Sequence, residues 1–376
     1  MKIVIAIDSF KGCLTSLEAG EAVAEGIKRA YKEAEIFVRP MADGGEGTVD
    51  AVVSALNGEF RYVTVNDPLC RPITGRYGIV NGTAFIEMAE ASGITLVTEA
   101  ERNPLHTTSY GVGELINDAI GRGIRDFVIG IGGSATNDGG LGMLSALGFE
   151  FLDENNKSIS LGAKGLKSLA NISSENVIKE LGDCTFKVAC DVRNPLCGSD
   201  GCSAVFGPQK GATKEMIKDM DKWLSDYAAL TKSLFPSADP DFPGSGAAGG
   251  LGFAFRSYLG ATLIPGIDLI IDSTRLEDYI KIADLVVTGE GRLDGQSCMG
   301  KAPVGVAKLA KKYGKTVIAF AGAVSADAIL CNEYGIDAFF PAVRRPCSLD
   351  TAMDSEIAKA NLADTAEQVF RLIKKV

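Results

Sequence analysis

The sequence predicts an α/β fold, in which parallel sheets are covered by helices. Short β-branched runs alternate with helical patterns along most of the chain, and strands that alternate with helices pack into parallel sheets. A length of 376 residues also exceeds what one hydrophobic core usually holds, so we expect two domains. The expected strands are residues 2–7, 36–38, 126–131, 186–189, 285–287 and 316–319.

A helix is expected directly after the first strand. Thr15 and Glu18 have the spacing of a capping box, in which each side chain satisfies a backbone N–H group of the first helical turn. Apolar positions such as Ala22 and Ile27 then give the helix one buried face as far as about Tyr31. These signals predict a strand–helix unit at the start of the chain.

A second, charged helix is expected from about Thr213 to Phe235. Pro236, Pro240 and Pro243 interrupt the pattern directly after it, because proline cannot donate the backbone hydrogen bond that a helix requires. This stretch marks a loop, and not necessarily a domain boundary.

The composition excludes several classes of protein. There are 38 Lys and Arg against 48 Asp and Glu, a net charge of -10 without a basic block, so we expect no nucleic-acid partner. The opening apolar run is too short for an export signal, and no later run is long enough to span a membrane. Nine cysteines without C-x-x-C spacing indicate reduced thiols, and hence a cytoplasmic protein. His106 is the only histidine, so carboxylates and lysines must carry most of the chemistry.

Six segments combine glycine with small polar or charged residues where a strand should end and a helix begin. Open α/β sheets bind their ligands at such places. Each segment alone is compatible with a plain turn, and it is their number that indicates a binding site. The segments are residues 8–12, 42–48, 130–140, 190–198, 245–252 and 288–303.

The first two segments carry charge next to glycine. Lys11 follows the first strand, where a lysine can reach a phosphate or carboxylate as a point charge; a solvated loop lysine is the alternative. Asp43 and Glu46 lie among glycines that permit a nest of backbone N–H groups, and their carboxylates can hold Mg²⁺ through water. Helix capping by Asp43 is the alternative there.

The third segment, residues 130–140, gives the strongest signal. A buried strand runs into a loop of glycine and hydroxyl residues that opens a helix, and its free N–H groups and helix dipole are suited to an anion. The loop also matches the dinucleotide fingerprint G-x-G-x-x-A, with Glu150 and Asp153 about 20 residues further on. That match is weak, because the polar stretch 134–138 stands where a dinucleotide fold starts its helix. An NAD-dependent oxidoreductase of a small hydroxy acid is the alternative function that rests on it.

The fourth segment places an acid, a base and an amide in one turn. Asp191 can accept a proton from a substrate hydroxyl as general base, while Arg193 or Asn194 orients the substrate. An Asx turn at Asp191 before Pro195 is the structural alternative.

The last two segments are less specific. Residues 245–252 can present a helix N-terminus to a ligand, although close helix packing explains their glycines nearly as well. In the sixth segment, Gly295, Gly300 and Lys301 have the spacing of a P-loop, but Ala302 replaces the Ser or Thr that binds magnesium. The lysine also lies too far from the preceding strand, and we reject a Walker A motif.

Taken together, the motifs resemble those of the class I glycerate kinase family. The resemblance spans residues 8–303, and the remaining strands and helices fit the same fold. It rests on the motifs D-S-F-K-G, M-A-D-G-G-E-G-T, G-I-G-G-S-A-T-N-D-G-G, C-D-V-R-N-P-L-C-G, G-A-A-G-G-L-G and V-V-T-G-E-G-R-L-D-G-Q-S-C-M-G-K-A-P.

The resemblance implies an activity and the location of the site, and the roles of the individual residues are our own inference. The implied activity is phosphorylation of D-glycerate by ATP, with Mg²⁺ as cofactor and 2-phosphoglycerate as product; spacing and composition do not show which hydroxyl reacts. We expect catalysis by Asp191, Lys11 and Arg193. Substrate and phosphate binding is assigned to Ser9, Gly132, Gly133, Ser134, Thr136, Asn137, Asp138, Asn194 and Gly289. Metal binding is assigned to Asp43, Glu46, Glu290 and Asp294.

The resemblance also implies the domain arrangement. It predicts a Rossmann-like α/β domain whose parallel sheet is built from both chain ends, residues 1–75 plus 283–376. A second α/β domain, residues 76–282, is inserted between them, with the active site in the cleft. A regulator that binds a metabolite without catalysis is a third, less favoured function, and the sequence gives no indication of oligomeric state.

Overall fold

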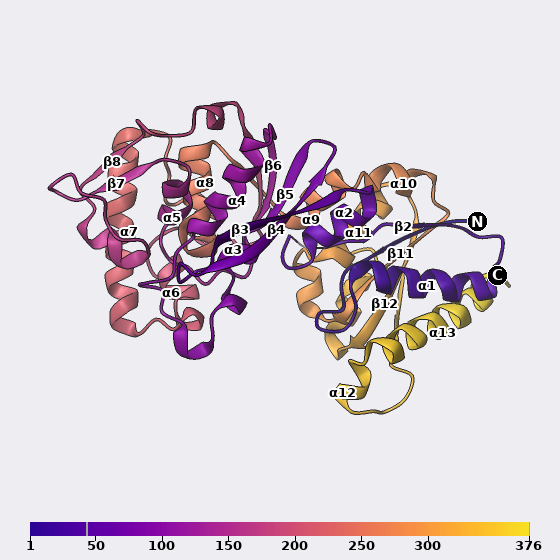
Figure 1. Cartoon of the computed structure of the whole chain (residues 1–376). Coiled ribbons are helices and arrows are strands. Elements are labelled where there is room, and N and C mark those ends of the chain that lie inside the picture. The colour runs from indigo at the N-terminus through magenta and orange to yellow at the C-terminus, as the bar shows by residue number, and fades with distance from the viewer. Residues whose placement is uncertain (43, 376) are drawn as a thin grey trace. The chain divides into compact units, whose positions relative to one another are not determined.

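A computed structural model describes residues 1–42 and 44–375 of the chain (Figure 1). Its internal contacts divide the chain into two compact units. Unit 1 comprises Met1–Asp43, Asp50–Gly58 and Ile267–Val376, and unit 2 comprises Gly44–Val49 and Glu59–Gly266. The domain limits expected from the sequence stay a prediction.

Unit 1 is built on a parallel sheet with the strand order β13-β12-β11-β1-β2. All four neighbouring pairs are parallel, as the alternation of strands and helices predicts. Every residue from Ile3 to Ile7 is buried, because helices cover both faces of the sheet. The strands are β1 (Lys2–Ile7), β2 (Glu35–Val38), β11 (Leu285–Leu293), β12 (Thr316–Val324) and β13 (Ala338–Pro341).

The expected first helix is confirmed as α1 (Ser16–Ala30), with the capping box at its start. The Thr15 hydroxyl accepts the Glu18 backbone N–H at 3.2 Å, and the Glu18 carboxylate accepts that of Thr15 at 2.9 Å. The other helices of this part of the chain are α2 (Thr48–Leu56), α9 (Gly266–Ser273), α10 (Leu276–Ile282), α11 (Ala302–Lys312), α12 (Leu349–Ala352) and α13 (Ser355–Ile373).

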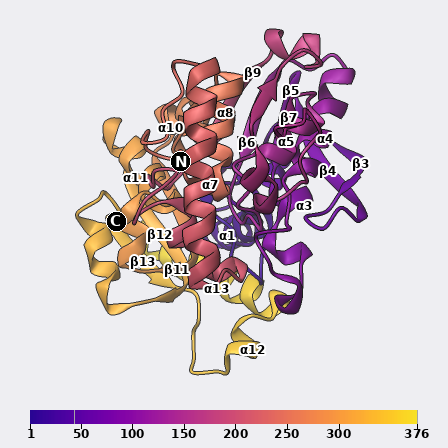
Figure 2. The same ribbon diagram turned by 90° about the vertical axis from the view of Figure 1, so that its left-hand side faces the viewer.

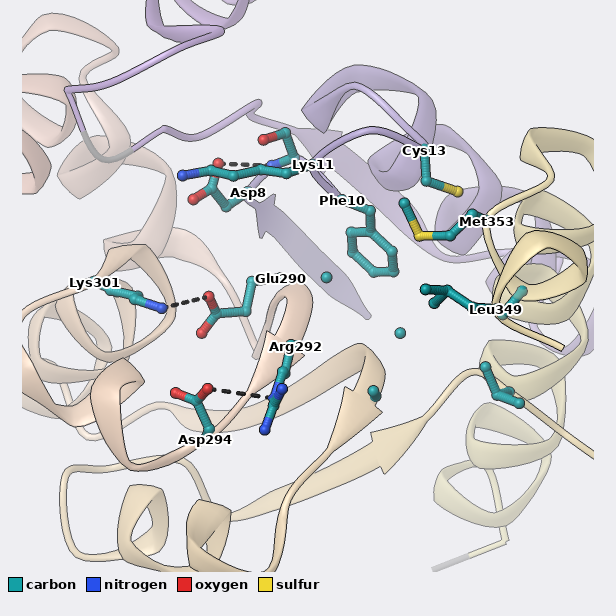
Figure 3. A pocket seen from close by; sticks show the side chains of 16 residues that line it. Asp8, Phe10, Lys11, Cys13, Glu290, Arg292, Asp294, Lys301, Leu349 and Met353 are labelled. Carbon is teal, nitrogen blue, oxygen red and sulfur yellow. Dashed lines mark hydrogen bonds and ion pairs between the residues drawn. The ribbon is translucent and has the colours of Figure 1, made fainter. Parts of the chain in front are cut away.

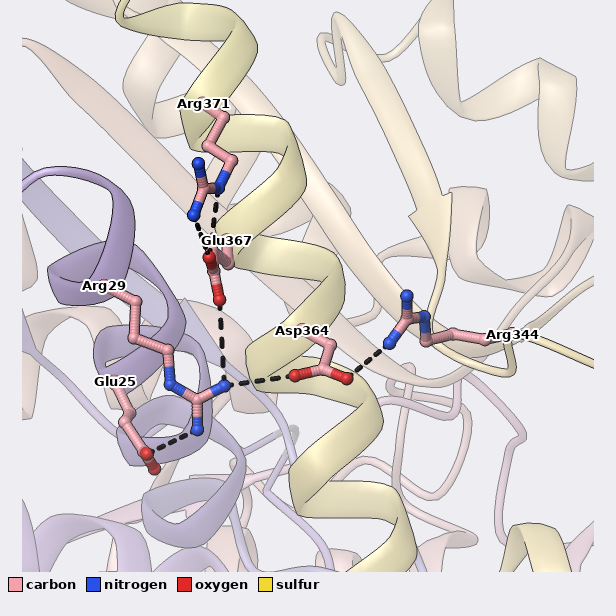
Figure 4. A network of polar contacts seen from close by, with 6 residues as sticks. All are labelled: Glu25, Arg29, Arg344, Asp364, Glu367 and Arg371. Atoms are coloured by element: carbon pink, nitrogen blue, oxygen red, sulfur yellow. Dashed lines mark hydrogen bonds and ion pairs between the residues drawn. The ribbon is translucent and has the colours of Figure 1, made fainter.

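Helices α1 and α13 pack against each other although they come from opposite ends of the chain (Figure 1). Gly26 is required at their crossing, since a Cβ atom there would lie 2.0 Å from the carbonyl oxygen of Ala363. A surface network of ion pairs surrounds Arg29 (Figure 4), whose guanidinium lies 3.1 Å from Asp364 and 2.6 Å from Glu25. Exposed ion pairs stabilise little, so the apolar contact between the helices carries most of the packing energy.

Unit 2 contains a mixed sheet with the strand order β10-β9-β6-β5-β4-β3. The pairs from β10 to β5 are parallel, and the expected strands near residues 126–131 and 186–189 are confirmed within them. Strands β3, β4 and β5, which form the antiparallel pairs β3–β4 and β4–β5, and the parallel edge strand β10 were not predicted from the sequence. The strands are β3 (Glu59–Asn66), β4 (Pro72–Val80), β5 (Thr83–Glu87), β6 (Asp126–Gly130), β9 (Thr185–Ala189) and β10 (Thr262–Ile264), and a separate antiparallel pair is β7 (Glu150–Leu152) with β8 (Asn171–Ser173).

The long helix α7 (Lys214–Leu234) confirms the charged helix expected from residue 213, and it runs vertically in Figure 2. The rings of Phe127 and Phe186 stack at 4.8 Å in the core of unit 2. The other helices are α3 (Ala89–Ser92), α4 (Tyr110–Gly121), α5 (Leu141–Ala146), α6 (Cys202–Phe206) and α8 (Leu251–Leu259). The short 3₁₀ segments of unit 2 are η1 (Ile94–Leu96), η2 (Glu99–Glu101), η3 (Ala163–Ser168), η4 (Lys179–Asp183), η5 (Pro208–Lys210) and η6 (Ala247–Gly250). Unit 1 contains η7 (Gly295–Met299) and η8 (Ala326–Asn332).

Across the described residues, no helix combines the length and the apolar character needed to cross a membrane.

Candidate active site

Unit 1 contains a cavity of about 450 Å³ at the carboxyl ends of its central strands (Figure 3). Residues 8–11 follow β1, residues 290–294 end β11 and its turn, and Gly322 and Ala323 lie in β12. These strands are parallel neighbours, so their carboxyl ends meet at one edge of the sheet, which is where α/β folds bind ligands.

Among the residues that the structure describes, three carboxylates line the cavity and are held in place by hydrogen bonds. Asp8 is buried and accepts the backbone N–H of Ser9 at 2.6 Å. Glu290 is also buried and accepts the Ser297 hydroxyl at 2.5 Å. Asp294 caps η7 by accepting the N–H of Ser297 at 3.3 Å, along with that of the residue before it. Fixed carboxylates suit a site that must hold a cation or a polar substrate in one orientation.

Three cationic side chains line the same cavity. The Lys301 ammonium lies 3.8 Å from the Glu290 carboxylate, and the Arg292 guanidinium lies 3.4 Å from that of Asp294 (Figure 3). Lys11 is exposed at the turn that follows β1, and its side chain extends along the same side of the cavity as Asp8. The cavity therefore offers both signs of charge, as a site for phosphate and a divalent cation must.

Four of the residues predicted for the site lie together in this cavity: Ser9, Lys11, Glu290 and Asp294. Gly289 lies next to them inside the sheet, paired with Ile7 and Phe320, and a Cβ atom there would lie 2.0 Å from the Phe320 carbonyl oxygen. That contact gives Gly289 a packing reason to be glycine, separate from its predicted role in binding.

Sequence reasoning did not assign Asp8, Arg292 or Lys301 to the site. In the sequence, Lys301 stands out only within the P-loop-like spacing that we reject as a Walker A motif. In the structure, it lines the cavity beside Glu290. A signal was available, because all three lie within the same glycine-containing segments as the residues that were chosen.

The predicted metal ligands fall into different parts of the chain. Asp43 lies outside the described residues, and Glu46 is exposed in unit 2. Glu290 and Asp294 share the cavity of unit 1 with Asp8. Within residues 1–42 and 44–375, no group of three or more His, Cys, Asp or Glu is close enough to enclose a metal ion by itself. The donor set fits Mg²⁺, which usually binds through one or two carboxylates and completes its shell with water and substrate phosphates.

In unit 2, the polar side chains of the loop after β6 turn toward the interior. Ser134 and Thr136 are buried, and the buried ammonium of Lys210 donates to the Ser134 hydroxyl at 2.7 Å and to the Thr136 carbonyl at 2.6 Å. Burial lowers the pKa of Lys210 to about 8. The buried Asn137 amide donates to the Ser203 hydroxyl at 2.8 Å. Only Gly132 and Gly133 of the predicted loop residues are exposed.

Asp138 is the centre of a buried hydrogen-bond cluster. Its carboxylate accepts the backbone N–H and the hydroxyl of Ser109 at 2.8 and 2.9 Å. It also accepts the N–H groups of Gly140 and Gly142 at 3.1 and 3.2 Å. Burial raises the pKa of Asp138, while these hydrogen bonds act in the opposite direction. The cluster connects the loop to the residues just before α4.

The geometry of the loop removes the support for a dinucleotide fingerprint. Strand β6 ends at Gly130 and α5 begins only at Leu141, whereas the fingerprint requires the helix to start within the glycine turn. The oxidoreductase alternative rested on that match alone.

The turn after β9 carries the remaining predicted residues. Asp191 and Arg193 are exposed, and one carboxylate oxygen of Asp191 accepts the backbone N–H of Gly266 at 2.8 Å. The Asn194 amide donates to the Asp200 carbonyl at 2.8 Å. All these groups belong to unit 2.

The fold and the cavity define an α/β enzyme with a mixed-charge pocket at the carboxyl edge of a parallel sheet. Comparison with known proteins identifies the class of enzyme: a sequence model of the "Glycerate kinase family" matches residues 3–374. The chain belongs to the glycerate kinase family, and it is a kinase.

Relatives along the whole chain support the assignment. The chain is 46% identical to a glycerate kinase of Haemophilus influenzae over 375 residues, which is 99% of both chains. It is 46% identical to the glycerate 2-kinase of Escherichia coli K12 over 354 residues, 94% of this chain and 93% of the relative. A crystal structure from Salmonella typhimurium LT2, assigned as a glycerate kinase 2, is 45% identical and superposes with a TM-score of 0.91, covering 100% of this chain and 98% of the other.

Proposed function

We propose that the protein transfers the γ-phosphoryl group of ATP to D-glycerate in the cytoplasm and releases 2-phosphoglycerate and ADP. The observation that carries the proposal is the cavity of unit 1, which brings two lysines and three carboxylates to the carboxyl edge of the sheet. The 46% identity to a glycerate 2-kinase supports the choice of substrate and of the reacting hydroxyl.

The lysines of the cavity are suited to the phosphates of ATP. Phosphoryl transfer depends mainly on positioning and on neutralising the charge of the transferred group. Lys11 extends beside Asp8, and Lys301 is held near Glu290 (Figure 3). Both ammonium groups then stabilise the phosphate oxygens as negative charge shifts toward the leaving ADP.

We propose that Mg²⁺ is held by Glu290 and Asp294, with Asp43 and Glu46 as the further predicted ligands. When bound, the ion neutralises the phosphates that the carboxylates alone would repel. The buried Glu290 carboxylate has the Lys301 ammonium beside it, so its negative charge is compensated before any ion arrives.

Asp191 is the proposed general base. Its exposed carboxylate follows the end of β9, and the Gly266 N–H fixes the direction of one oxygen. As the hydroxyl oxygen of glycerate forms its bond to phosphorus, the bond from phosphorus to the ADP oxygen breaks and the hydroxyl proton passes to Asp191. Arg193 and Asn194 bind the carboxylate of glycerate in this proposal, with Ser9 near the phosphates.

The glycine loop of unit 2 takes part mainly through its backbone. Gly132 and Gly133 are exposed and present N–H groups to an anion, whereas the side chains of the next residues are buried. Ser134, Thr136, Asn137 and Asp138 therefore support substrate binding by holding the shape of the loop, and Gly289 does so by allowing close packing in the sheet.

The test is incubation of the purified protein with ATP, Mg²⁺ and D-glycerate. We expect ADP release that depends on D-glycerate and on Mg²⁺, and a single phosphorylated product that ³¹P NMR identifies as 2-phosphoglycerate. L-glycerate and a reaction without acceptor serve as controls. Formation of 3-phosphoglycerate would overturn the proposed regiochemistry, and absence of ADP release would overturn the choice of donor.

A further inference from the structure

The cavity of unit 1 has two chemically different halves (Figure 3). The charged side chains lie together on one side, next to the ends of β1 and β11. The other side is an apolar wall, in which Phe10 and Cys13 face residues at and around α12. The residues that we call the apolar wall are Phe10, Cys13, Val343, Leu349, Ala352 and Met353.

The apolar wall contains large apolar side chains that are exposed to solvent. Leu349 is 75% exposed and Met353 is 39% exposed, although both line the cavity. Phe10 is buried in the same wall. Met353 approaches the turn after β1, since its Cε lies 3.3 Å from where a Cβ of Gly12 would be. Apolar surface that lines a concave site is typical of a ligand pocket.

D-glycerate does not account for this half of the cavity. The acid carries oxygen on each of its carbons, so it has no apolar face to bury against Leu349 or Met353. A cavity of about 450 Å³ is within the range that holds a ligand much larger than glycerate. A second ligand with both an anionic and an apolar part is needed to match the two halves.

We infer that the apolar wall binds the base of the nucleotide, while the phosphates reach the charged half at Lys11 and Lys301. The inference rests on the proposed function, which makes ATP the phosphoryl donor. A planar base buries apolar area against Leu349 and Met353, and the thioether of methionine adapts readily to aromatic surfaces. The phosphates then extend toward the carboxyl ends of β1 and β11, where the cationic side chains lie.

The inference assigns α12 a function that no sequence motif indicates. The helix contains only four residues and carries no glycine or lysine, yet its first residue is an exposed leucine in the cavity. Its hydroxyl N-cap, in which Ser348 accepts the Thr351 N–H at 3.3 Å, fixes the start of the helix and thereby the direction of Leu349.

The experiment compares ligands with and without a base. The double variant Leu349→Ser/Met353→Ser removes the apolar wall at exposed positions, where little effect on folding is expected. Calorimetric titration measures the affinity of this variant for ADP and for inorganic tripolyphosphate, which has phosphates but no base. The control is Leu372→Ser, a leucine that is 66% exposed on α13 and does not line the cavity.

We expect the double variant to bind ADP about tenfold more weakly, with an equal rise in KM for ATP. Its affinity for tripolyphosphate and its KM for D-glycerate stay at the wild-type values, and Leu372→Ser changes none of these quantities. If the double variant does not fold, as judged by its urea midpoint, Leu349→Ser alone carries the test.

Two outcomes separate this inference from the proposed function. If the wild type binds ADP and phosphorylates D-glycerate but the wall variants bind ADP normally, the base lies elsewhere and the inference is overturned. If the wild type neither binds ADP nor consumes ATP, the proposed function fails together with the inference.

Discussion

Two glycine-containing segments follow buried strands in this protein, and they differ in the exposure of their polar side chains. After β1, Lys11 is exposed and lines a cavity. After β6, the side chains from Ser134 to Asp138 are all buried. Those of Ser134, Asn137 and Asp138 form hydrogen bonds inside unit 2, whereas the Thr136 hydroxyl has no partner among the described residues. In the sequence, both segments show glycine beside small polar residues at the end of an apolar strand.

The burial of the second segment is explained by hydrogen-bond partners in the interior of unit 2. Lys210, 76 residues from Ser134, and Ser203, 66 residues from Asn137, supply buried partners for the second loop. Buried polar groups need such partners, since an unpaired one costs roughly 1–3 kcal/mol. A polar loop can therefore be a structural element, and its local sequence does not reveal this.

The largest effect is expected for Asp138→Ala. Removing the carboxylate leaves the N–H groups of Ser109, Gly140 and Gly142 without their acceptor in a buried site. We expect the free energy of unfolding to fall by roughly 3–5 kcal/mol. Urea denaturation measures the loss, and Asp200→Ala, an exposed aspartate of the same unit, should change it by about 0.5 kcal/mol or less. Lost activity at unchanged stability would make the Asp138 side chain a ligand group and end the contrast.

The pH dependence of stability that Lys210 causes is a second test of the same buried loop. Burial lowers its pKa from 10.5 to about 8, so the unfolded chain binds more protons than the folded chain between these values. The stability contributed by this group therefore rises as pH increases from 8 to 10.5, by roughly 3 kcal/mol at most. The nearby Cys202, whose pKa burial raises to about 11, remains protonated over most of this window.

The measurement is the difference in unfolding free energy between the wild type and Lys210→Met. It is made at about pH 7.5, which lies below this window, and at about pH 9.5, which lies within it. Subtracting the variant removes the titration of other groups. We expect the wild type to gain stability relative to the variant at the higher pH. A difference that does not change with pH would mean that burial does not lower the pKa of the Lys210 ammonium.

Lys11→Met should affect catalysis and leave folding nearly unchanged. Loss of a charge that faces the transferred phosphoryl group lowers kcat/KM by about 100-fold or more, whereas an exposed lysine contributes little to stability. Steady-state kinetics and urea denaturation on the same preparation check both parts. Lys232→Met, an exposed lysine on α7, is the matched control. Activity within a few-fold of wild type would remove Lys11 from the site.

The smallest effect is expected for polar contacts on the surface. Arg29→Met removes the ion pair with Asp364, which connects α1 to α13, and the pair with Glu25 within α1 (Figure 4). Because these side chains are exposed, we expect a loss of about 1 kcal/mol or less, which decreases further in high salt. A thermal unfolding series over salt concentration measures it. A loss as large as that of Asp138→Ala would show that burial is not what separates the two kinds of contact.

The sequence predicted those parts of the structure that depend on local patterns. The six expected strands, α1 with its capping box and α7 are confirmed, whereas the parallel edge strands β10 and β13 were not predicted. The strands β3 and β4 were missed because the prediction relied on strands that alternate with helices, whereas β3, β4 and β5 follow one another without a helix between them.

Within the candidate site, the sequence predicted residues that follow strands and lie next to glycine. Ser9, Lys11, Glu290 and Asp294 meet in one cavity because neighbouring parallel strands end at one edge. The apolar wall around α12 was not predicted, since Leu349 and Met353 belong to no glycine segment and approach the cavity only through the tertiary fold. The predicted roles of Asp191, Arg193 and Asn194 stay predictions.

The most direct test of the account is a crystal structure of the protein with ADP and Mg²⁺. We predict phosphate oxygens within about 3.2 Å of the ammonium groups of Lys11 or Lys301, and the base against Leu349 and Met353. Phosphates bound to residues 132–138 of unit 2, with no nucleotide in the cavity of unit 1, would contradict the assignment of this cavity as the phosphoryl-donor site.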